Sequence, residues 1–195
     1  MDNKFIVFEG PDNIGKTTLC NKVSEILTQK NKTCEVHSFP GNQKGTLGKF
    51  VHNFHHNHQK YGVTNIPNIS LQLFHVAAHF DTIEKNIKPA IANNEYLLLD
   101  RYWWSTYVYG KVNNIKQSLL DKLLEIEKLA WKELLPDTIV LLTNDSPFEG
   151  AASEEWLQLR KEYLKIAENS TTPEVIQFSN VGDIEDNAQK LIKLF

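Results

Sequence analysis

The chain has 195 residues, of which 41% are hydrophobic and 23% are charged, so it is long enough for one buried core and too short for two full domains. Its formal net charge of −3 excludes a generally basic nucleic-acid-binding protein, and an anionic ligand must therefore be met by a local cluster of positive charge. With two cysteines, no leader-like segment and no apolar run near the ~20 residues that cross a bilayer, the sequence predicts a cytoplasmic protein without membrane or polymeric nucleic-acid partners.

Short apolar runs rich in branched and aromatic residues alternate along the chain with longer segments of helical periodicity. The runs predict five strands, at residues 4–8, 33–39, 96–99, 138–142 and 174–178. The helical patterns predict helices at residues 16–30, 47–57, 69–93 (interrupted near Asp81 or Pro89), 103–112, 118–134, 153–169 and 184–195. Strands that are apolar on both faces belong in a parallel sheet with helices on each side. The sequence therefore predicts an α/β three-layer sandwich with a five-stranded parallel sheet, in a single domain over residues 1–195.

The segment that follows the first predicted strand matches the phosphate-binding pattern G-x-x-x-x-G-K-[ST], from Gly10 to Thr17, and a helix opens directly after it. The glycines let backbone N–H groups turn toward a phosphate, and the helix adds the positive end of its dipole. We expect Lys16 to contact the β- and γ-phosphates and the Thr17 hydroxyl to bind Mg²⁺. The residues expected to bind the nucleotide are Gly10, Asn13, Ile14, Gly15, Lys16, Thr17 and Thr18. The predicted fold is thus of the P-loop NTPase type.

A P-loop indicates a nucleoside triphosphate without indicating the reaction, because GTPases, motors and small-molecule kinases share it. The N-K-x-D guanine signature of GTPases does not occur in the sequence. A kinase needs a second anion site, and the third predicted strand ends in Asp100, Arg101 and Tyr102 at the sheet edge where open α/β sheets bind ligands. The first strand brings Glu9 to the same edge. Asp100 is expected to hold Mg²⁺ through its water shell and Arg101 to clamp an acceptor phosphate, the alternative being a structural Asp100–Arg101 ion pair.

The order and spacing of these motifs resemble the thymidylate kinase family of nucleoside monophosphate kinases, over essentially the whole chain. The matching residues are Phe8-Glu9-Gly10, Asp12, Gly15-Lys16-Thr17-Thr18, Phe39-Pro40, Thr46, Gly48-Lys49, Ile87-Lys88-Pro89-Ala90, Asp100-Arg101-Tyr102 and Ser105. The resemblance implies a Mg²⁺- and ATP-dependent kinase that phosphorylates a deoxynucleoside monophosphate, thymidylate above others. It also implies small nucleotides as partners and a homodimer.

The resemblance further implies roles at the acceptor site. Asp12 would face the acceptor sugar hydroxyl and the metal, and Arg101 would hold the acceptor phosphate. Phe74 is one candidate for stacking on the base, but the register counted back from residues 87–90 places His75 there and His79 where the family has a base-contacting arginine. The stacking residue and the base therefore stay open. The residues expected at the acceptor site are Glu9, Asp12, Phe39, Pro40, Lys44, Phe74, His75, His79, Arg101, Tyr102 and Ser105.

One feature of the family is missing. Its members usually carry an arginine in the P-loop, at the position of Asn13, or in a lid, which here is predicted at about residues 143–155 and is acidic. Besides Arg101, the chain has one other arginine, Arg160, which is therefore the candidate cation over the transferred phosphoryl group beside the catalytic residues Lys16, Arg101 and Asp12. The alternative for Arg160 is a surface residue paired along its own helix.

The missing arginines keep two other functions open. One is a kinase for another or modified nucleotide or for a deoxynucleoside, and the other is a nucleotide-binding regulatory protein with little turnover. Four histidines at helical spacing, within residues 52–58, also suggest a metal site. Because no cysteine or paired carboxylate accompanies them, we expect this polar stretch to be a solvated helix face.

Overall fold

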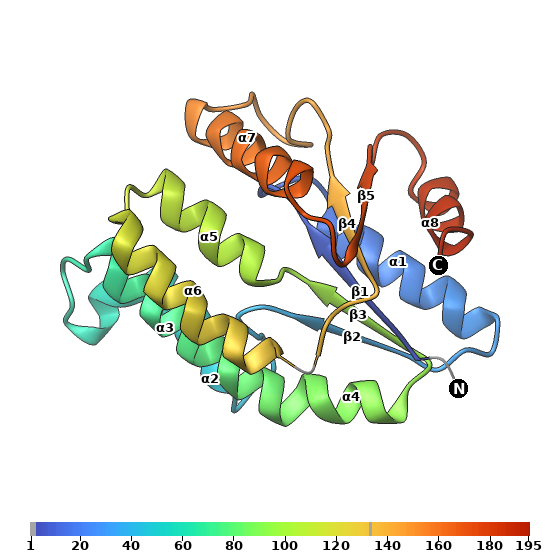
Figure 1. Cartoon of the computed structure of the whole chain (residues 1–195), viewed down its shortest axis with the longest axis horizontal. Helices are drawn as coiled ribbons and strands as arrows, with labels where there is room; N and C mark the ends of the chain where they lie inside the picture. The colour runs from blue at the N-terminus through green and yellow to red at the C-terminus, as the bar shows by residue number, and fades with distance from the viewer. Residues whose placement is uncertain (1–2, 133) are drawn as a thin grey trace.

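A five-stranded parallel sheet forms the centre of the computed structural model, which describes residues 3–132 and 134–195 (Figure 1). The strand order is β2-β3-β1-β4-β5, and every neighbouring pair is parallel. The strands are β1 (Lys4–Glu9), β2 (Cys34–Ser38), β3 (Tyr96–Asp100), β4 (Thr138–Leu142) and β5 (Glu174–Phe178). Each agrees with its predicted range to within one residue at either end, so the predicted parallel sheet is confirmed.

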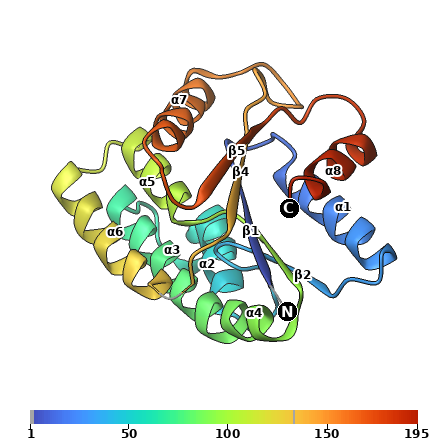
Figure 2. The same ribbon diagram turned by 45° about the vertical axis from the view of Figure 1, so that its right-hand side comes forward.

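The two faces of the sheet carry two apolar cores, because successive strand residues point to opposite sides. Phe8 packs in one core with α1 (Lys16–Gln29) and α8 (Ile184–Ile192), and Val7 packs in the other. The remaining helices are α2 (Leu47–Asn57), α3 (Asn68–Thr82), α4 (Lys88–Asn93), α5 (Trp103–Val112), α6 (Gln117–Trp131) and α7 (Glu154–Glu168). Figure 2 shows α1 and α8 on one side of the sheet and these helices on the other. The predicted three-layer α/β sandwich is therefore confirmed.

The long predicted helix at residues 69–93 is interrupted between the two expected points. α3 ends at Thr82, one π-helical turn covers Ile83–Ile87, and α4 begins at Lys88. Pro89 lies at the start of α4, just past the π-helical turn, and the backbone stays helical through Ile87 and Lys88 before it. The break is thus a widened turn rather than a proline kink.

The carboxyl ends of the central strands converge at one edge of the sheet. β1 leads into the P-loop and α1, while β3 pairs with β1 so that Phe8 lies opposite Asp100. Helix α2 lies very close to the loop after β2. A Cβ at Gly48, in the first turn of α2, would be only 2.0 Å from the Pro40 carbonyl oxygen. Glycine at position 48 therefore lets α2 lie beside the same sheet edge.

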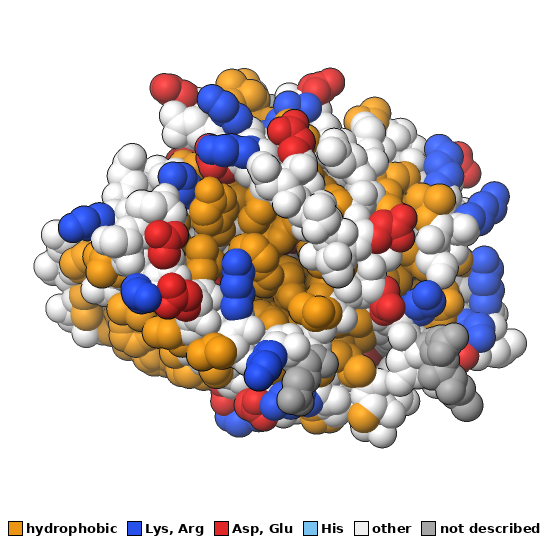
Figure 3. Space-filling model, viewed as in Figure 1, with side chains coloured by type: hydrophobic (Ala, Val, Ile, Leu, Met, Phe, Trp, Pro, Cys, Tyr) orange, Lys and Arg blue, Asp and Glu red, His pale blue; other side chains and the backbone are white. Residues whose placement is uncertain are grey.

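The surface on the side viewed in Figure 1 has a hydrophobic centre. Orange side chains gather between α6 and α7, and acidic and basic side chains are interspersed around them (Figure 3). This face carries no broad patch of a single charge. None of the helices in the described part of the chain combines the length and the apolar character that crossing a membrane would require.

Candidate active site

The P-loop surrounds a small cavity between the end of β1 and the start of α1. Gly15 has a φ of 82°, in the left-handed region, and a Cβ there would lie 2.4 Å from a ring carbon of Phe148, so two constraints favour glycine. The cavity has a volume of about 250 Å³. Its lining residues are Asp12, Asn13, Gly15, Lys16, Thr17, Thr18, Asp100 and Arg101. Of the residues expected at the nucleotide, Gly10 and Ile14 do not line the cavity: the Gly10 carbonyl oxygen accepts from Lys16, and the Ile14 side chain is buried in the core.

Lys16 is held at the centre of the P-loop. Its Nζ donates hydrogen bonds to the carbonyl oxygens of Gly10 at 2.9 Å and Pro11 at 2.6 Å. Burial, together with the positive charge of Arg101, lowers the pKa of Lys16 to about 8, although nearby carboxylates oppose the shift. A buried ammonium of this kind gains from a phosphate that replaces the carbonyls as its partner.

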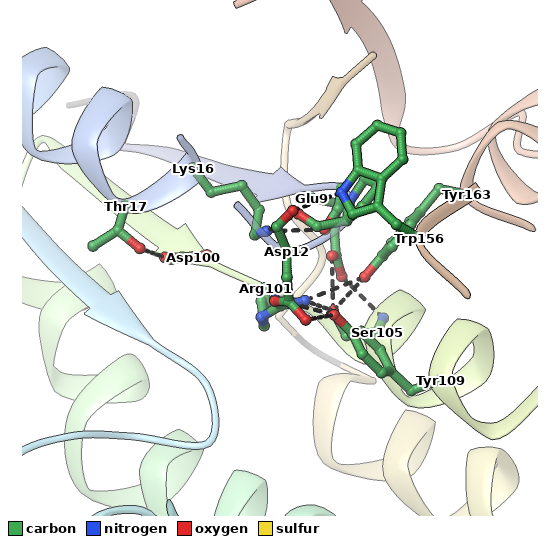
Figure 4. Close-up of polar contacts among 12 residues, drawn as sticks. Glu9, Asp12, Lys16, Thr17, Asp100, Arg101, Ser105, Tyr109, Trp156 and Tyr163 are labelled. Atoms are coloured by element: carbon green, nitrogen blue, oxygen red, sulfur yellow. Dashed lines mark hydrogen bonds and ion pairs between the residues drawn. The ribbon is translucent and has the colours of Figure 1, made fainter. Parts of the chain in front are cut away.

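The Thr17 hydroxyl and the Asp100 carboxylate meet at the same edge of the sheet (Figure 4). Thr17 Oγ1 donates to Asp100 Oδ2 at 2.5 Å. Asp100 Oδ1 is buried and has no hydrogen-bond partner among the described residues. A carboxylate oxygen left free beside a hydroxyl suits Mg²⁺, which is usually held by one or two carboxylates together with water and phosphate oxygens. Within residues 3–132 and 134–195, no three or more His, Cys, Asp or Glu side chains are placed so that together they could hold a metal ion.

Glu9, at the end of β1, binds the start of α5 through hydrogen bonds. The carboxylate is fully buried and accepts hydrogen bonds from the Tyr102 N–H at 2.7 Å, the Ser105 N–H at 3.1 Å and the Ser105 hydroxyl at 2.9 Å. Burial raises the pKa of Glu9 to about 7, against the charge of Arg101 and these hydrogen bonds. We expected Glu9 and Tyr102 to contact the acceptor. The structure instead buries both beneath the site, where they position the segment that carries Arg101.

Arg101 lies at the centre of the polar network in Figure 4. Its φ of 81° is a left-handed conformation that a non-glycine residue adopts at a cost, as functional residues often do. The guanidinium forms an ion pair with Asp12 and donates to Ser105 Oγ at 3.1 Å and to the hydroxyls of Tyr109 and Tyr163 at 3.4 Å. Burial alone would raise the pKa of Asp12, but Arg101 and the Tyr109 hydrogen bond outweigh it and lower the pKa. Arg101 is thus a fixed cation at the carboxyl end of β3.

A second, larger cavity of about 490 Å³ adjoins the P-loop cavity. The two share Asp12, Thr17, Asp100 and Arg101. The second cavity extends from this shared edge toward the loop after β2 and the helices α2, α3 and α5. It brings together the expected acceptor residues Asp12, Phe39, Pro40, His75, His79, Arg101 and Ser105. The arrangement therefore offers one anion site at the P-loop and another beside Arg101.

Besides Glu9 and Tyr102, two more of the expected acceptor residues, Lys44 and Phe74, lie outside this cavity. Phe74 is 41% exposed and packs against Phe54, with ring centroids 5.4 Å apart, rather than lining the cavity. Lys44 is exposed on the loop after β2 and does not line it either. His75 does line it, so the register that favours His75 over Phe74 agrees with the structure.

Arg160 differs from the expectation that it covers the transferred phosphoryl group. Its guanidinium donates to the carbonyl oxygens of Asn144 at 2.9 Å and Thr143 at 3.3 Å, and it pairs with Asp145 at 2.8 Å. It lines neither of the two cavities. Arg160 therefore anchors the loop after β4, where the predicted lid begins. This differs both from the expected catalytic role and from the alternative, an ion pair along its own helix.

The predicted lid, about residues 143–155, packs on the P-loop. The Phe148 N–H donates to the Asn13 carbonyl oxygen at 2.8 Å, and the Asn13 side chain donates back to the Glu149 carbonyl oxygen at 3.1 Å. Trp156, just beyond this segment, donates from its indole N–H to the Asp12 carbonyl oxygen at 2.8 Å. Movement of this segment would therefore break or shift hydrogen bonds to the P-loop backbone.

Several residues of the site were not predicted from the sequence. Tyr109 lies one helical turn after Ser105 on the same face of α5, a spacing that offers a signal for it. Tyr163 and Trp156 come from α7, and nothing near them in sequence points to the site. The three histidines of α2 are exposed, as expected of a solvated helix face, and they also line the larger cavity, which the sequence did not predict.

The chain matches the family model for thymidylate kinase over residues 8–177. A thymidylate kinase from Thermoanaerobacter sp. (strain X514) is 29% identical over 143 residues, covering 73% of this chain and 66% of the relative, just under two thirds. A protein described as "probable thymidylate kinase" from Archaeoglobus fulgidus is 27% identical over 205 residues, covering 97% of this chain and 95% of the relative.

The fold has a counterpart among solved structures. The crystal structure of thymidylate kinase from Ehrlichia chaffeensis superimposes with a TM-score of 0.74 over 100% of this chain and 98% of that one, at 24% sequence identity. This likeness covers the whole sheet and its helices. Together with the family match over residues 8–177, which includes the P-loop and the segment around Arg101, it leads to one assignment: the chain belongs to the thymidylate kinase family.

Proposed function

We propose that the protein is a thymidylate kinase, which transfers the γ-phosphoryl group of ATP to the 5′-phosphate of thymidylate in the presence of Mg²⁺. The observation that carries this proposal is the pair of adjoining cavities with a shared edge at Asp12, Thr17, Asp100 and Arg101. Phosphoryl transfer needs donor and acceptor phosphates in line and close together, and two anion sites with a common boundary supply that arrangement.

The donor site is assigned to the P-loop. Lys16 and the loop N–H groups would hold the β- and γ-phosphates, and the Thr17 hydroxyl and Asp100 would hold Mg²⁺. When bound, Mg²⁺ neutralises charge on the donor's phosphate oxygens. Lys16 adds a buried positive charge on the same side, which stabilises the negative charge that shifts toward the leaving ADP as the γ-phosphorus–oxygen bond breaks.

The acceptor site is assigned to the larger cavity. The acceptor's phosphate belongs at the shared edge, where Arg101 offers its planar donors, because one of its oxygens must form the new bond to the γ-phosphorus. The nucleoside then extends away from the P-loop into the rest of the larger cavity, between the loop after β2 and the helices α3 and α5. Asp12 and Tyr109 hold the guanidinium, so that it is oriented before substrate binds.

We also propose that the protein is cytoplasmic, as its sequence predicts, and that it forms a homodimer, as the resemblance to the thymidylate kinase family implies. The test of the kinase activity is a screen of ATP consumption with each natural nucleoside monophosphate and nucleoside, with the products identified by mass. We expect thymidine diphosphate to form fastest. Faster transfer to another nucleotide or to a nucleoside would identify that compound, and not thymidylate, as the substrate. ATP binding without transfer to any acceptor would contradict a kinase function.

A further inference from the structure

Five of the seven histidines of the chain line the proposed acceptor cavity. They come from two helices: His52, His55 and His56 from α2, and His75 and His79 from α3. We call them the histidine cluster. Their rings follow one another across the cavity, with centroids 4.7 Å apart for His52 and His56, 5.1 Å for His55 and His56, and 6.5 Å for His75 and His79.

The two helices are joined inside this cluster by a hydrogen bond between two imidazoles. His55 Nδ1 and His75 Nε2 are 3.0 Å apart. A neutral pair has one proton between these nitrogens, and one of the two outer nitrogens, His55 Nε2 or His75 Nδ1, then lacks a proton. One added proton makes both outer nitrogens donors and gives the pair a single positive charge. Neither outer nitrogen has another partner among the residues the structure describes.

The permanent charges of the cavity do not by themselves balance the charge of a phosphate monoester. Asp12 and Asp100 are acidic, Arg101 is the one permanently charged cation among the described lining residues, and it is already paired with Asp12. A monophosphate adds between one and a half and two negative charges at about pH 7. The imidazoles are the remaining lining groups that can become positive.

We propose that the histidine cluster is a proton-coupled phosphate clamp: binding of the acceptor monophosphate draws one proton onto the His55–His75 pair. This inference rests on the proposed function, since it takes the acceptor to be a nucleoside monophosphate. It assigns binding roles to the histidines of α2, and it makes affinity for the acceptor depend on pH. A nucleoside without phosphate gains nothing from the added proton.

The surroundings of the pair keep it neutral until an anion arrives. Burial and the neighbouring imidazoles lower the pKa of His55, although Asp12 opposes the shift. Burial, His79, His55 and Arg101 lower the pKa of His75 to about 3. The pKa of His52 is lowered as well, by burial and by the charges of His56 and Lys49. From α6, Glu127 faces the far end of the cluster through His79, 2.6 Å from its Nδ1.

A phosphate dianion placed among these groups reverses the balance, because it favours the charged imidazole. The complex then binds one proton more than the free protein, and affinity falls as pH rises through the window between the free and bound pKa values. His55, which is exposed, gives the proton a route from solvent, and His75 shares it across the hydrogen bond. The expected slope is a loss of affinity of up to about tenfold per pH unit.

The test is isothermal titration of the full-length protein with thymidine 5′-monophosphate at pH 7.5 in several buffers of different ionisation enthalpy. At this pH the free monophosphate is almost wholly dianionic, since its second pKa is about 6. The dependence of the observed enthalpy on the buffer gives the number of protons taken up. We expect close to one for the monophosphate and close to zero for thymidine, used as the matched ligand without phosphate.

The variants His55→Gln and His75→Gln keep hydrogen-bonding capacity but cannot take up the proton. We expect each to abolish proton uptake and to weaken monophosphate binding at pH 7 by about tenfold. His58→Gln is the control in the same stretch, because His58 does not line the cavity, and it should retain full uptake. Thermal unfolding of each variant verifies that it is folded.

Two results would overturn the clamp. Binding of the monophosphate without proton uptake would show that the imidazoles stay neutral, and unchanged uptake in both variants would assign the proton to another group, such as Glu9. Phosphoryl transfer to thymidylate, measured on the same preparation, keeps this separate from the proposed function. Transfer without proton uptake contradicts the clamp alone, whereas no binding and no transfer contradict both.

Discussion

Glu9 accepts two hydrogen bonds from Ser105, one from its N–H at 3.1 Å and one from its hydroxyl at 2.9 Å. The hydroxyl of Ser105 also accepts from the Arg101 guanidinium at 3.1 Å. A buried carboxylate of β1 thus positions, through one serine, the arginine at the end of β3. The acceptor site therefore depends on a residue that does not touch the acceptor.

We expect Glu9→Gln to impair the acceptor site more than the donor site. Glutamine offers one acceptor oxygen where glutamate offers two, and its amide NH₂ faces a backbone N–H or the serine hydroxyl. The KM for thymidylate should rise about tenfold or more, the KM for ATP should change less than about threefold, and stability should fall by about 1–3 kcal/mol. Steady-state kinetics and urea unfolding measure these quantities, and equal effects on both KM values would contradict the positioning role.

Lys16→Ala should abolish turnover while the fold persists. The side chain contacts two carbonyl oxygens of its own loop, so its removal leaves the apolar cores intact. We expect kcat to fall by about a thousandfold or more, with a melting temperature within a few degrees of wild type. Lys22→Ala is the matched control, because Lys22 is a half-buried lysine of the same helix that lines neither cavity. A kcat for Lys16→Ala within about threefold of wild type would remove the P-loop from the donor site.

Arg101→Lys should weaken binding of the monophosphate selectively. An ammonium cannot make the two parallel hydrogen bonds of a guanidinium, and it cannot contact Asp12, Ser105 and Tyr163 at the same time as a phosphate. Lysine and arginine have the same conformational cost at a φ of 81°, so the substitution does not change the backbone strain at this position. The KM for thymidylate should rise at least about tenfold. Weaker ATP binding with an unchanged acceptor KM would place Arg101 on the donor side.

Arg160→Ala tests whether this arginine anchors a loop or acts on the phosphoryl group. Because its guanidinium contacts two carbonyl oxygens and Asp145, we expect its loss to lower stability by about 1–3 kcal/mol and to change kcat less than about threefold. A tenfold fall in kcat with unchanged stability, restored in part by adding Asn13→Arg, would instead show that Arg160 leaves the loop during the reaction.

His75 should make the folded protein sensitive to mild acid. Its pKa is about 3 in the folded state against an ordinary value of 6.5, so the unfolded chain binds more protons between these pH values. Stability is therefore complete above about pH 6.5 and falls as pH decreases, by at most about 2 kcal/mol between pH 7 and pH 5 from this group. Urea unfolding of His75→Gln should show a flatter pH dependence over this range. Identical slopes in the two proteins would contradict a half-buried imidazole that stays neutral in the folded state.

The fold was predictable because the three central strands, β1, β3 and β4, are apolar on both faces and β1 ends in a P-loop. The role of Glu9 was also within reach. Alternation places Glu9 on the same face as Val7, which is the face that packs against α5, and not on the ligand side. The histidines of α2 were not predictable, because their place at the cavity depends on the close approach of Gly48 to Pro40. The contacts of Arg160 were not predictable either, because its partners lie on a loop whose path no local sequence pattern indicates.

The central claim, that two adjoining sites hold ATP and thymidylate with their phosphates in line, is tested most directly by one ligand that spans both. That ligand joins adenosine and thymidine through a chain of five phosphates, and its affinity is measured by titration calorimetry against ATP and thymidylate. We expect one molecule to bind per chain, more tightly than either substrate and in competition with both, since the second contact becomes intramolecular. Binding no tighter than ATP, with displacement of ATP alone, would contradict the account.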